Sequence, residues 1–588
     1  MDKNFFFAFF LSTLVILGYY WMYPPAPPAP EDNNAIEQTT EENKDSSTTQ
    51  DNTGAAIKLP EPLAPMTLSA TRKKVEVNTS VFKAEIDSQD GILRNLSLKD
   101  FKYALEQHKS LKDIVVDFFT GDKTEIVDVD LNRLVNMTGD LSVKNKIWNI
   151  TTDLDPKTVN YHVSTEKLDI INQEGTLTLQ AQLENGLEIT KKLTFYPDSY
   201  EFDFDLIIIN RSDGNQRIYP RLNFGAANEI IEFQPRPVPK KAFTFTDDEF
   251  EIFDDEEDYE NVLNAKNNTF AGIMDTYFLT AVKMADPKQT FDGEVSPLDS
   301  MIKDQKVIIP KLEFVEPKVD LLPNQTYEKH FRVYMGPKHF DLIEAFHLEM
   351  PKTMDIWLDA LAQPLLITLR WFQSFVVNWG VAIILLTIVV RLAMLPLAYK
   401  GIMSMAKMSD LNPQMKAIRE KYKDKKERMN KEIMELYKRN KVNPVGGCLP
   451  MVLQIPIFIA LYQALLPAIE LRHSPFIFWL TDLSAPDYTL ILPLLMGISM
   501  FLQQSLTPTP TMDPTQAKMM KWMPVMFIFF FLDMPAGLVL YWVVSNIISI
   551  FQQMLFNKIK NKKGIGNVAA AATANEALAK QKTKKKKK

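Results

Sequence analysis

Residues 381–397 read Val-Ala-Ile-Ile-Leu-Leu-Thr-Ile-Val-Val-Arg-Leu-Ala-Met-Leu-Pro-Leu, an apolar stretch with a single arginine, Arg391, inside it. A helix that crosses a bilayer needs about 20 mostly apolar residues, and this stretch reaches that length between about 376 and 398. Five similar stretches lie near 5–23, 448–467, 488–506, 518–534 and 537–556. The sequence therefore predicts a polytopic α-helical membrane protein with six transmembrane helices.

The first apolar stretch, within residues 1–23, predicts a membrane anchor. It follows Lys3, and the Pro-rich stretch after it offers no small-residue cleavage site, so we expect an uncleaved signal anchor. Residues 24–56 are rich in Glu, Asp, Asn, Thr and Ser. They have too few apolar side chains to offset the entropy lost on ordering, and we expect a disordered linker.

Residues 57–345 carry the pattern of an acidic soluble β-domain. Segments such as Leu177-Thr-Leu-Gln-Ala-Gln-Leu183 alternate between apolar and polar residues and are separated by Asn, Asp, Gly and Pro, which indicates mostly antiparallel strands in a β-sandwich. The one cysteine, Cys448, lies outside this region, so packing alone must stabilise it. The acids between Asp247 and Glu260 fit a solvated loop better than a carboxylate site.

Residues 346–375 contain an amphipathic helical pattern. Apolar side chains recur at helical spacing at Trp357, Leu361, Leu365, Leu369 and Phe372. Such a helix can lie along the membrane interface or pack against the β-domain, and the pattern does not separate the two.

The charges of the connecting segments predict the orientation in the membrane. Residues 399–441 hold thirteen Lys and Arg against six acids, and the positive-inside rule makes this segment cytoplasmic. Both termini are then cytoplasmic, and residues 57–345 lie on the outer face. A break near Lys423-Asp424 predicts a helical hairpin. Residues 557–588 hold eleven lysines against one acid, which indicates a disordered tail attracted to polyanions.

Arg391 is the strongest candidate for a functional residue. A central arginine in a membrane helix costs roughly 2.5–3.5 kcal/mol, so it should face protein or a water-filled cavity. Thr387 lies one turn earlier on the same face, and Gln454 and Asn546 on other helices can complete a wet groove. Two simpler alternatives stay open: Arg391 can snorkel to the cytoplasmic interface, and the amides can form ordinary interhelical hydrogen bonds.

Signatures of enzymes and metal proteins are lacking in the sequence. The six histidines form no ligand cluster, and neither a phosphate-binding loop nor a Gly-x-Ser-x-Gly elbow occurs. We therefore expect a protein that is not an enzyme, with no catalytic residues, metal or cofactor. An ion-coupled transporter using Arg391 is one rival, although it predicts inverted repeats that are not evident. A carbohydrate-binding or hydrolytic β-domain is another.

Several short motifs point to a family. They are Ser404-Met-Ala-Lys-Met408, Lys441-Val-Asn-Pro-Val-Gly-Gly-Cys-Leu-Pro450, Gln454-Ile-Pro-Ile-Phe458, Glu470-Leu-Arg472, Trp479 with Asp482-Leu483, and Gly537-Leu-Val-Leu-Tyr-Trp542. With the five spans of 376–556 in order, they make residues 355–556 similar to the YidC/Oxa/Albino family of insertases. The anchor and the large external domain resemble the Gram-negative form in architecture.

The resemblance implies a fold, a location and an activity. The fold would be a five-helix insertase core with a periplasmic all-β supersandwich domain, in the bacterial inner membrane. The activity would be to assist insertion, folding and assembly of integral membrane proteins, alone or with the SecYEG translocon and associated Sec proteins. Nascent membrane proteins, the ribosome and the lipid bilayer are the other partners implied.

The resemblance also assigns residues. Arg391 would lie in a hydrophilic groove open to the cytoplasm and to lipid, the groove to which the polar pattern also adds Thr387, Gln454 and Asn546. The resemblance places Thr387 at a position that contacts the client as well, on the apolar slide along 376–398 and 537–556. An apolar slide for the client would include Tyr541 and Trp542, although the family often has a second tyrosine where this chain has tryptophan. The cytoplasmic hairpin and the basic tail would contact the ribosome, the tail through Lys584, Lys585, Lys586, Lys587 and Lys588.

Overall fold

The structure is a computed structural model. It describes residues 72–102, 134–137, 150–151, 158–224, 241–246, 249–253, 263–302, 305–354, 356, 358–423, 425–440, 449–506 and 514–562. The chain divides into two compact units, residues 1–65 and 66–588, and all described residues belong to the second. The expected anchor (1–23), the linker (24–56), Cys448 and the lysines 584–588 lie outside the described residues.

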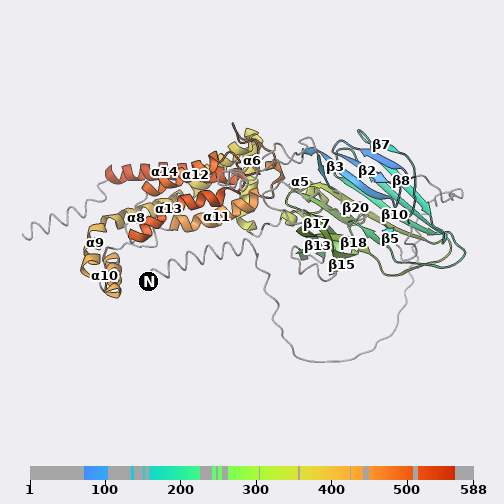
Figure 1. The fold of residues 1–588 in the computed structure, drawn as a ribbon, viewed down its shortest axis with the longest axis horizontal. Helices are drawn as coiled ribbons and strands as arrows, with labels where there is room; N and C mark the ends of the chain where they lie inside the picture. Colours follow the sequence, from blue (N-terminus) through green and yellow to red (C-terminus); the bar gives the residue numbers. More distant parts are fainter. Residues whose placement is uncertain are drawn as a thin grey trace, which may run out of the picture. The chain divides into compact units, whose positions relative to one another are not determined.

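The β-domain consists of two large sheets and a small one (Figure 1). One sheet has the order β4 (Leu134–Asn136), β3 (Ile92–Lys102), β2 (Phe82–Asp87), β1 (Lys74–Asn78), β7 (Lys167–Asp169). The larger has the order β5 (Ile150–Thr151), β12 (Arg221–Asn223), β18 (Gln305–Val315), β17 (Phe291–Ile302), β15 (Leu263–Met274), β16 (Phe278–Met284), β20 (Thr326–Pro337), β10 (Glu201–Asn210), β9 (Leu187–Phe195), β8 (Gly175–Gln182), β6 (His162–Val163). Strand β13 (Lys241–Thr246) joins β15 and pairs with β14 (Glu249–Phe253), and β11 (Gln216–Ile218) pairs with β19 (Val319–Leu321).

Alternation along the strands builds the core between the sheets. In β10, Phe202, Phe204 and Leu206 are buried while the residues between them are half-buried, as expected when successive side chains point to opposite faces. Phe82 of β2 lies 6.1 Å from Phe195 of β9, measured between ring centroids, so the two sheets pack face to face. The expected antiparallel β fold is confirmed, with β1 and β7 as a parallel pair.

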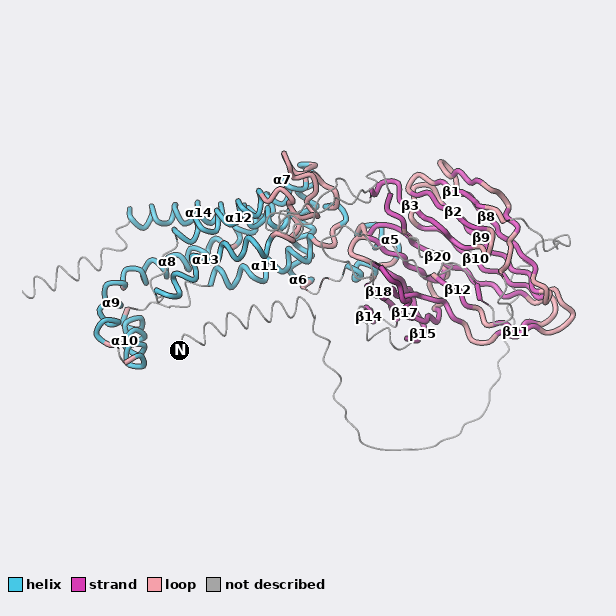
Figure 2. The backbone as a smooth tube through the Cα atoms, viewed as in Figure 1, coloured by secondary structure: helices cyan, strands magenta, loops and turns pink. Residues whose placement is uncertain are grey.

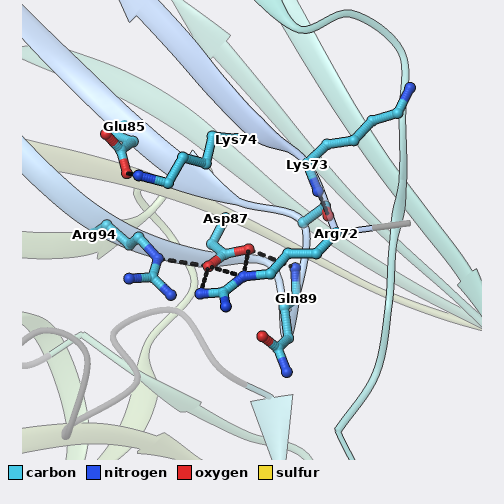
Figure 3. A network of polar contacts seen from close by, with 8 residues as sticks. Arg72, Lys73, Lys74, Glu85, Asp87, Gln89 and Arg94 are labelled. Atoms are coloured by element: carbon cyan, nitrogen blue, oxygen red, sulfur yellow. Dashed lines mark hydrogen bonds and ion pairs between the residues drawn. The ribbon is translucent and has the colours of Figure 1, made fainter. Parts of the chain in front are cut away.

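Asp87, at the end of β2, is a fully buried carboxylate held by two arginines (Figure 3). Arg72 donates to it from Nη2 at 2.7 Å and from Nε at 3.0 Å, and Arg94 donates from Nε at 2.5 Å. The Gln89 backbone N–H donates at 3.0 Å. A buried charge is tolerated when it is paired and hydrogen-bonded in this way. The network links the segment before β1, the end of β2 and the start of β3 in the five-stranded sheet.

Lys191 is another charged residue of the β-domain that is fully buried. Its Nζ donates to the backbone oxygens of Asp90 at 2.8 Å and Gly91 at 3.1 Å, and it lies 4.7 Å from the centroid of the Tyr161 ring. Burial lowers the pKa of the Lys191 ammonium to about 7, against the opposing influence of the Asp90 carboxylate. The side chain therefore loses its charge near neutral pH in the folded protein.

This pKa predicts a pH dependence of stability. An unfolded lysine keeps a pKa of about 10.4, so above pH 7 the unfolded chain binds more protons and the unfolding free energy rises with pH. We expect the β-domain to gain up to about 1.4 kcal/mol per pH unit between pH 7 and 9, below the range in which tyrosines titrate. Urea unfolding of the full chain should show this rise of the unfolding free energy with pH, and the Lys191→Met variant should show a smaller one. Equal slopes in the two proteins would rule out Lys191 as the cause.

The helical part follows the β-domain in the chain. It consists of α5 (Phe340–Phe346), a 3-10 helix at Met350–Met354, α6 (Asp359–Val376), α7 (Trp379–Ala393), α8 (Leu395–Asp410), α9 (Asn412–Lys421), α10 (Lys426–Arg439), α11 (Leu449–Leu465), a 3-10 turn at Ile469–Leu471, α12 (Ile491–Leu506), α13 (Pro514–Phe531) and α14 (Ala536–Lys562).

The long helices form a bundle (Figure 2). Helix α14 packs against α7, α11 and α12, α6 packs against α7 and α11, and α13 packs against α12. Helices α9 and α10 lie at one end of the bundle, and α8 connects them to α7. A separate small core of Met408, Leu411, Met415 and Tyr437 holds α9 and α10 together.

The stretch expected as one span at 376–398 is two helices. Helix α7 ends at Ala393, and α8 starts at Leu395 after a bend of 60°. Pro396 is in the first turn of α8, where its missing N–H is tolerated although its ring hinders an unbroken helix. Helix α8 then continues to Asp410, so the first part of the 399–441 segment belongs to it, and α9 and α10 are separated at 422–425.

Few of the described helices are long and apolar enough, taken singly, to cross a bilayer. Within the described residues, α14 over Ala536–Ile559 is long and apolar enough to cross a bilayer, and α7 with α8 passes as a bent pair. The apolar segments Gln454–Leu465, Ile491–Leu506 and Trp522–Phe531 are shorter. The count of six spans stays a prediction.

Candidate functional site

The Arg391 side chain lies in the last turn of α7 and points toward α14. It is half-buried, and its Nε donates to the Ser545 hydroxyl of α14 at 2.7 Å, with a second bond from Nη2. Thr387, one turn earlier, is fully buried and donates to the Ile383 carbonyl oxygen of its own helix at 2.7 Å. The arginine is therefore held in the bundle by a neutral hydroxyl.

Tyr541 connects this contact to a third helix. Its hydroxyl accepts from Gln454 Nε2 of α11 at 2.6 Å and also interacts with Ser545 and the Arg391 guanidinium. The ring is fully buried. Tyr541 and Ser545 are four residues apart and so share a face of α14, which is the face that meets α7.

Asn546 makes a separate polar contact on the next face of α14. Its side-chain amide donates to the Ser499 hydroxyl of α12 at 3.0 Å, and both residues are buried. We define the polar cluster as the residues that make these contacts: Thr387, Arg391, Gln454, Ser499, Tyr541, Ser545 and Asn546. It joins α7, α11, α12 and α14 inside the bundle.

The charge of the polar cluster is not balanced nearby. In the part of the chain that the structure describes, no carboxylate lies within 4.0 Å of the Arg391 guanidinium. At low dielectric a positive charge with a neutral partner attracts any anion that reaches it. The polar cluster can therefore bind an acidic side chain. A metal site is a separate question: the described residues contain no group of three or more His, Cys, Asp or Glu side chains that could hold a metal ion.

Apolar surface lies beside the polar cluster. On α7, the exposed side chains include Val389 and Leu392, and on α14 they include Ile547 and Phe551. Trp542 is half-buried instead, with its ring centroid 4.8 Å from that of Phe458. Exposed apolar side chains of α7 and α14 are therefore found next to the polar cluster.

The structure brings part of the predicted groove set together. Arg391 and Gln454 meet through Tyr541 and Ser545, whereas Asn546 is directed to α12 and Tyr541, expected on the slide, is buried in the polar cluster. Ser499 was not predicted as a site residue. A signal for it exists: Gly497 and Ser499 are small residues in an apolar helix, which is typical of close helix packing.

Comparisons with known proteins account for both halves of the chain. The family model described as YidC periplasmic domain matches residues 74–368, and the one described as 60Kd inner membrane protein matches residues 371–563. The membrane protein insertase YidC of Pelobacter propionicus is 35% identical over 516 residues, which cover 84% of this chain and 88% of that protein. The chain belongs to the YidC family of membrane protein insertases.

Other YidC proteins match at similar levels. The YidC of Vibrio atlanticus is 36% identical over 510 residues, with 84% of this chain and 88% of that protein covered. A solved structure described as an active YidC insertase covers 83% of this chain and 93% of its own, at 19% identity and a TM-score of 0.35.

Membership in the YidC family settles the broad function. The chain is a membrane protein insertase of the inner membrane, with the supersandwich-like β-domain as its periplasmic domain, and it is not an enzyme. The recognition made from the motifs is confirmed, and the ion-coupled transporter is set aside. Nascent membrane proteins are the substrates of a YidC insertase.

Proposed function

We propose that the polar segment of a client enters the membrane at the polar cluster and contacts Arg391, while its apolar segment moves along α7 and α14 into lipid. The observation that carries the proposal is the half-buried guanidinium, bonded to Ser545 and without a nearby carboxylate among the described residues. Transfer of apolar surface into lipid, at about 25 cal/mol per Å², drives the process. Gln454, which is half-buried, lines the path beside Arg391, and half-buried Trp542 borders the slide. Thr387, Tyr541 and Asn546 are buried and support the path from inside the bundle.

The orientation follows from charge and from contacts between loops. The backbone N–H groups of Ala536 and Gly537 donate to the oxygens of Ala485 and Leu483, and Asn378 Nδ2 donates to the Phe476 oxygen. These contacts place the start of α7, the 466–490 loop and the α13–α14 turn at one end of the bundle, which we assign to the periplasmic side. The basic hairpin α9–α10 and both termini are then cytoplasmic.

Short helices support local thinning of the bilayer. Helix α7 has 15 residues and α12 has 16, which at about 1.5 Å per residue span roughly 22–24 Å, less than the ~30 Å of a typical hydrocarbon core. A bilayer adapts to short helices by thinning. The distance over which a polar segment must be moved is then reduced.

The basic cytoplasmic parts suit a ribosome. In the described hairpin, Lys416, Lys421 and Lys431 are exposed, and clustered lysines and arginines bind phosphate backbones through electrostatic attraction. We assign ribosome contact to this hairpin and to the lysines 584–588 of the tail, and cooperation with the SecYEG translocon and associated Sec proteins to clients with long translocated segments.

Access of water to the polar cluster tests the groove. The chain has one cysteine, so Gln454→Cys on a Cys448→Ala background gives a single reactive thiol. In inverted membrane vesicles, a membrane-impermeant maleimide should label position 454 about tenfold faster than position 455, because thiolates form only where water reaches them.

The matched control is Ile455→Cys, which lies at the same depth on α11 and is 43% exposed to the surroundings of the bundle. Protein unfolded by detergent and heat should label equally at both positions. Labelling of 455 at least as fast as 454 in the membrane would refute a groove that is open to the cytoplasm.

A further inference from the structure

A tight apolar turn projects from the periplasmic loop between α11 and α12. The backbone N–H of Phe476 donates to the Leu480 oxygen at 2.9 Å, and that of Leu480 donates to the Ile477 oxygen at 3.2 Å. Ile477 and Phe478 form the tip of this turn, and the sequence Ser474-Pro-Phe-Ile-Phe-Trp-Leu480 contains no charged residue.

The base of the turn is fixed to the bundle. The Phe476 ring covers Gly380 at the start of α7 so closely that a Cβ there would lie 2.1 Å from Cδ2 of the ring. Asn378 Nδ2 donates to the Phe476 oxygen at 3.0 Å, and Trp479 Nε1 donates to Asp487 Oδ2 at 3.2 Å. The tip therefore has a defined position relative to α7.

Two exposed apolar residues in this area adopt backbone conformations that favour glycine. Phe478 has φ 54° and is 84% exposed, and Val377, the capping residue that follows α6, has φ 58° and is 80% exposed. Left-handed conformations are strained for bulky and β-branched residues, and strain of this kind points to function. The chain thus presents large apolar side chains at positions where glycine would fold more easily.

The apolar surface continues from Val377 along α6. Its outward face carries Ile367, Trp371 and Phe375, each more than half exposed, while Leu366 and Leu369 of the opposite face are buried in the bundle. The Trp371 and Phe375 rings lie 5.0 Å apart, measured between centroids. Exposed apolar patches of this extent mark an interaction surface.

We propose that Ile477 and Phe478, together with Val377, insert into the outer leaflet of the bilayer and anchor the periplasmic end of α7. Lipid is the occupant that fits, because the turn is uncharged, its tip is continuous with the apolar face of α6, and it is attached to the first turn of a membrane helix. Tryptophan concentrates at this level of membrane proteins, and Trp479 directly follows Phe478 in the chain, while Trp371 lies on α6 shortly before Val377. The anchor fixes the depth of α7 independently of any client at Arg391.

Spin-label accessibility measures this insertion. We would label Phe478→Cys on the Cys448→Ala background with a nitroxide, in the full chain reconstituted into phosphatidylethanolamine and phosphatidylglycerol vesicles. Oxygen concentrates in lipid and a nickel chelate stays in water. The ratio of their collision rates at position 478 should be at least about threefold higher than at a water-exposed site of the β-domain, as expected for a probe below the headgroups.

Two controls match the exposure of the tip. Phe529→Cys on α13 is 66% exposed and gives the value for lipid, whereas Ile171→Cys in the β-domain is 67% exposed and gives the value for water. A ratio at 478 equal to that at 171 would overturn the proposal, and so would low collision rates with both reagents, since these would mean that protein covers the tip. Val377→Cys should give the same result as 478.

Discussion

Replacing Arg391 by alanine is expected to slow the insertion of a client with a short acidic translocated tail about tenfold, because the attraction between guanidinium and carboxylate is lost. Charges 4 Å apart at an effective dielectric constant of about 20 attract each other by about 4 kcal/mol, and a loss of about 1.4 kcal/mol already changes a rate tenfold. Water in the half-buried site weakens the attraction between the guanidinium and the carboxylate below about 4 kcal/mol. We therefore expect a tenfold decrease in the insertion rate and not a larger one. Protease protection of the tail in proteoliposomes measures it.

The control for Arg391→Ala is Arg391→Lys. Lysine keeps the charge and loses the two-pronged bond to Ser545, so it should retain most of the insertion rate. A second client with an uncharged tail separates attraction from structure. Equal slowing of both clients by Arg391→Ala would contradict the electrostatic role and indicate that the arginine only holds α7 against α14.

Replacing Asp87 by alanine is expected to destabilise the β-domain by about 3 kcal/mol, the lower end of the range for breaking a buried ion pair. The carboxylate is fully buried, and its removal takes the counter-charge from Arg94, whose side chain is 20% exposed (Figure 3). Arg72 is 49% exposed and can turn to water, which limits the loss. The change in the unfolding free energy is measured by urea unfolding of the full chain, monitored through the hydrogen exchange of strands β1 to β3.

The control for Asp87→Ala is an exposed pair of similar geometry. Arg217 Nε and Asp320 Oδ1 are 2.7 Å apart, with both side chains more than half exposed. Asp320→Ala should change the unfolding free energy by less than about 1 kcal/mol. If the two substitutions destabilise equally, burial of the Asp87 network does not have the role assigned to it.

Local sequence patterns predicted the elements well and their ends less well. Alternation revealed strands such as β10, and apolar length revealed the helices of the bundle. The break between α7 and α8 was not predicted, because the apolar side chains continue through Pro396 and hide the change of direction. Sheet order was beyond reach, since β1 pairs with β7 about 90 residues later and only tertiary packing selects that partner.

The residues of the polar cluster also differ in how far the sequence could predict them. Arg391 was identifiable because a charge in an apolar helix is costly wherever it points. Its partner Ser545 and the buried position of Tyr541 depend on how α14 is rotated against α7, which the sequence of one helix does not state. The i,i+4 spacing of Tyr541 and Ser545 on α14, like that of Thr387 and Arg391 on α7, is the signal that would have paired the two helices.

A charge exchange between protein and client tests most directly whether Arg391 receives the polar segment. Arg391→Glu would be reconstituted without a membrane potential and given either the acidic-tailed client or the same client with its acids changed to lysine. We expect the unaltered insertase to favour the acidic tail and Arg391→Glu to favour the lysine tail. The same order of preference for both proteins would contradict direct contact between Arg391 and the translocated segment.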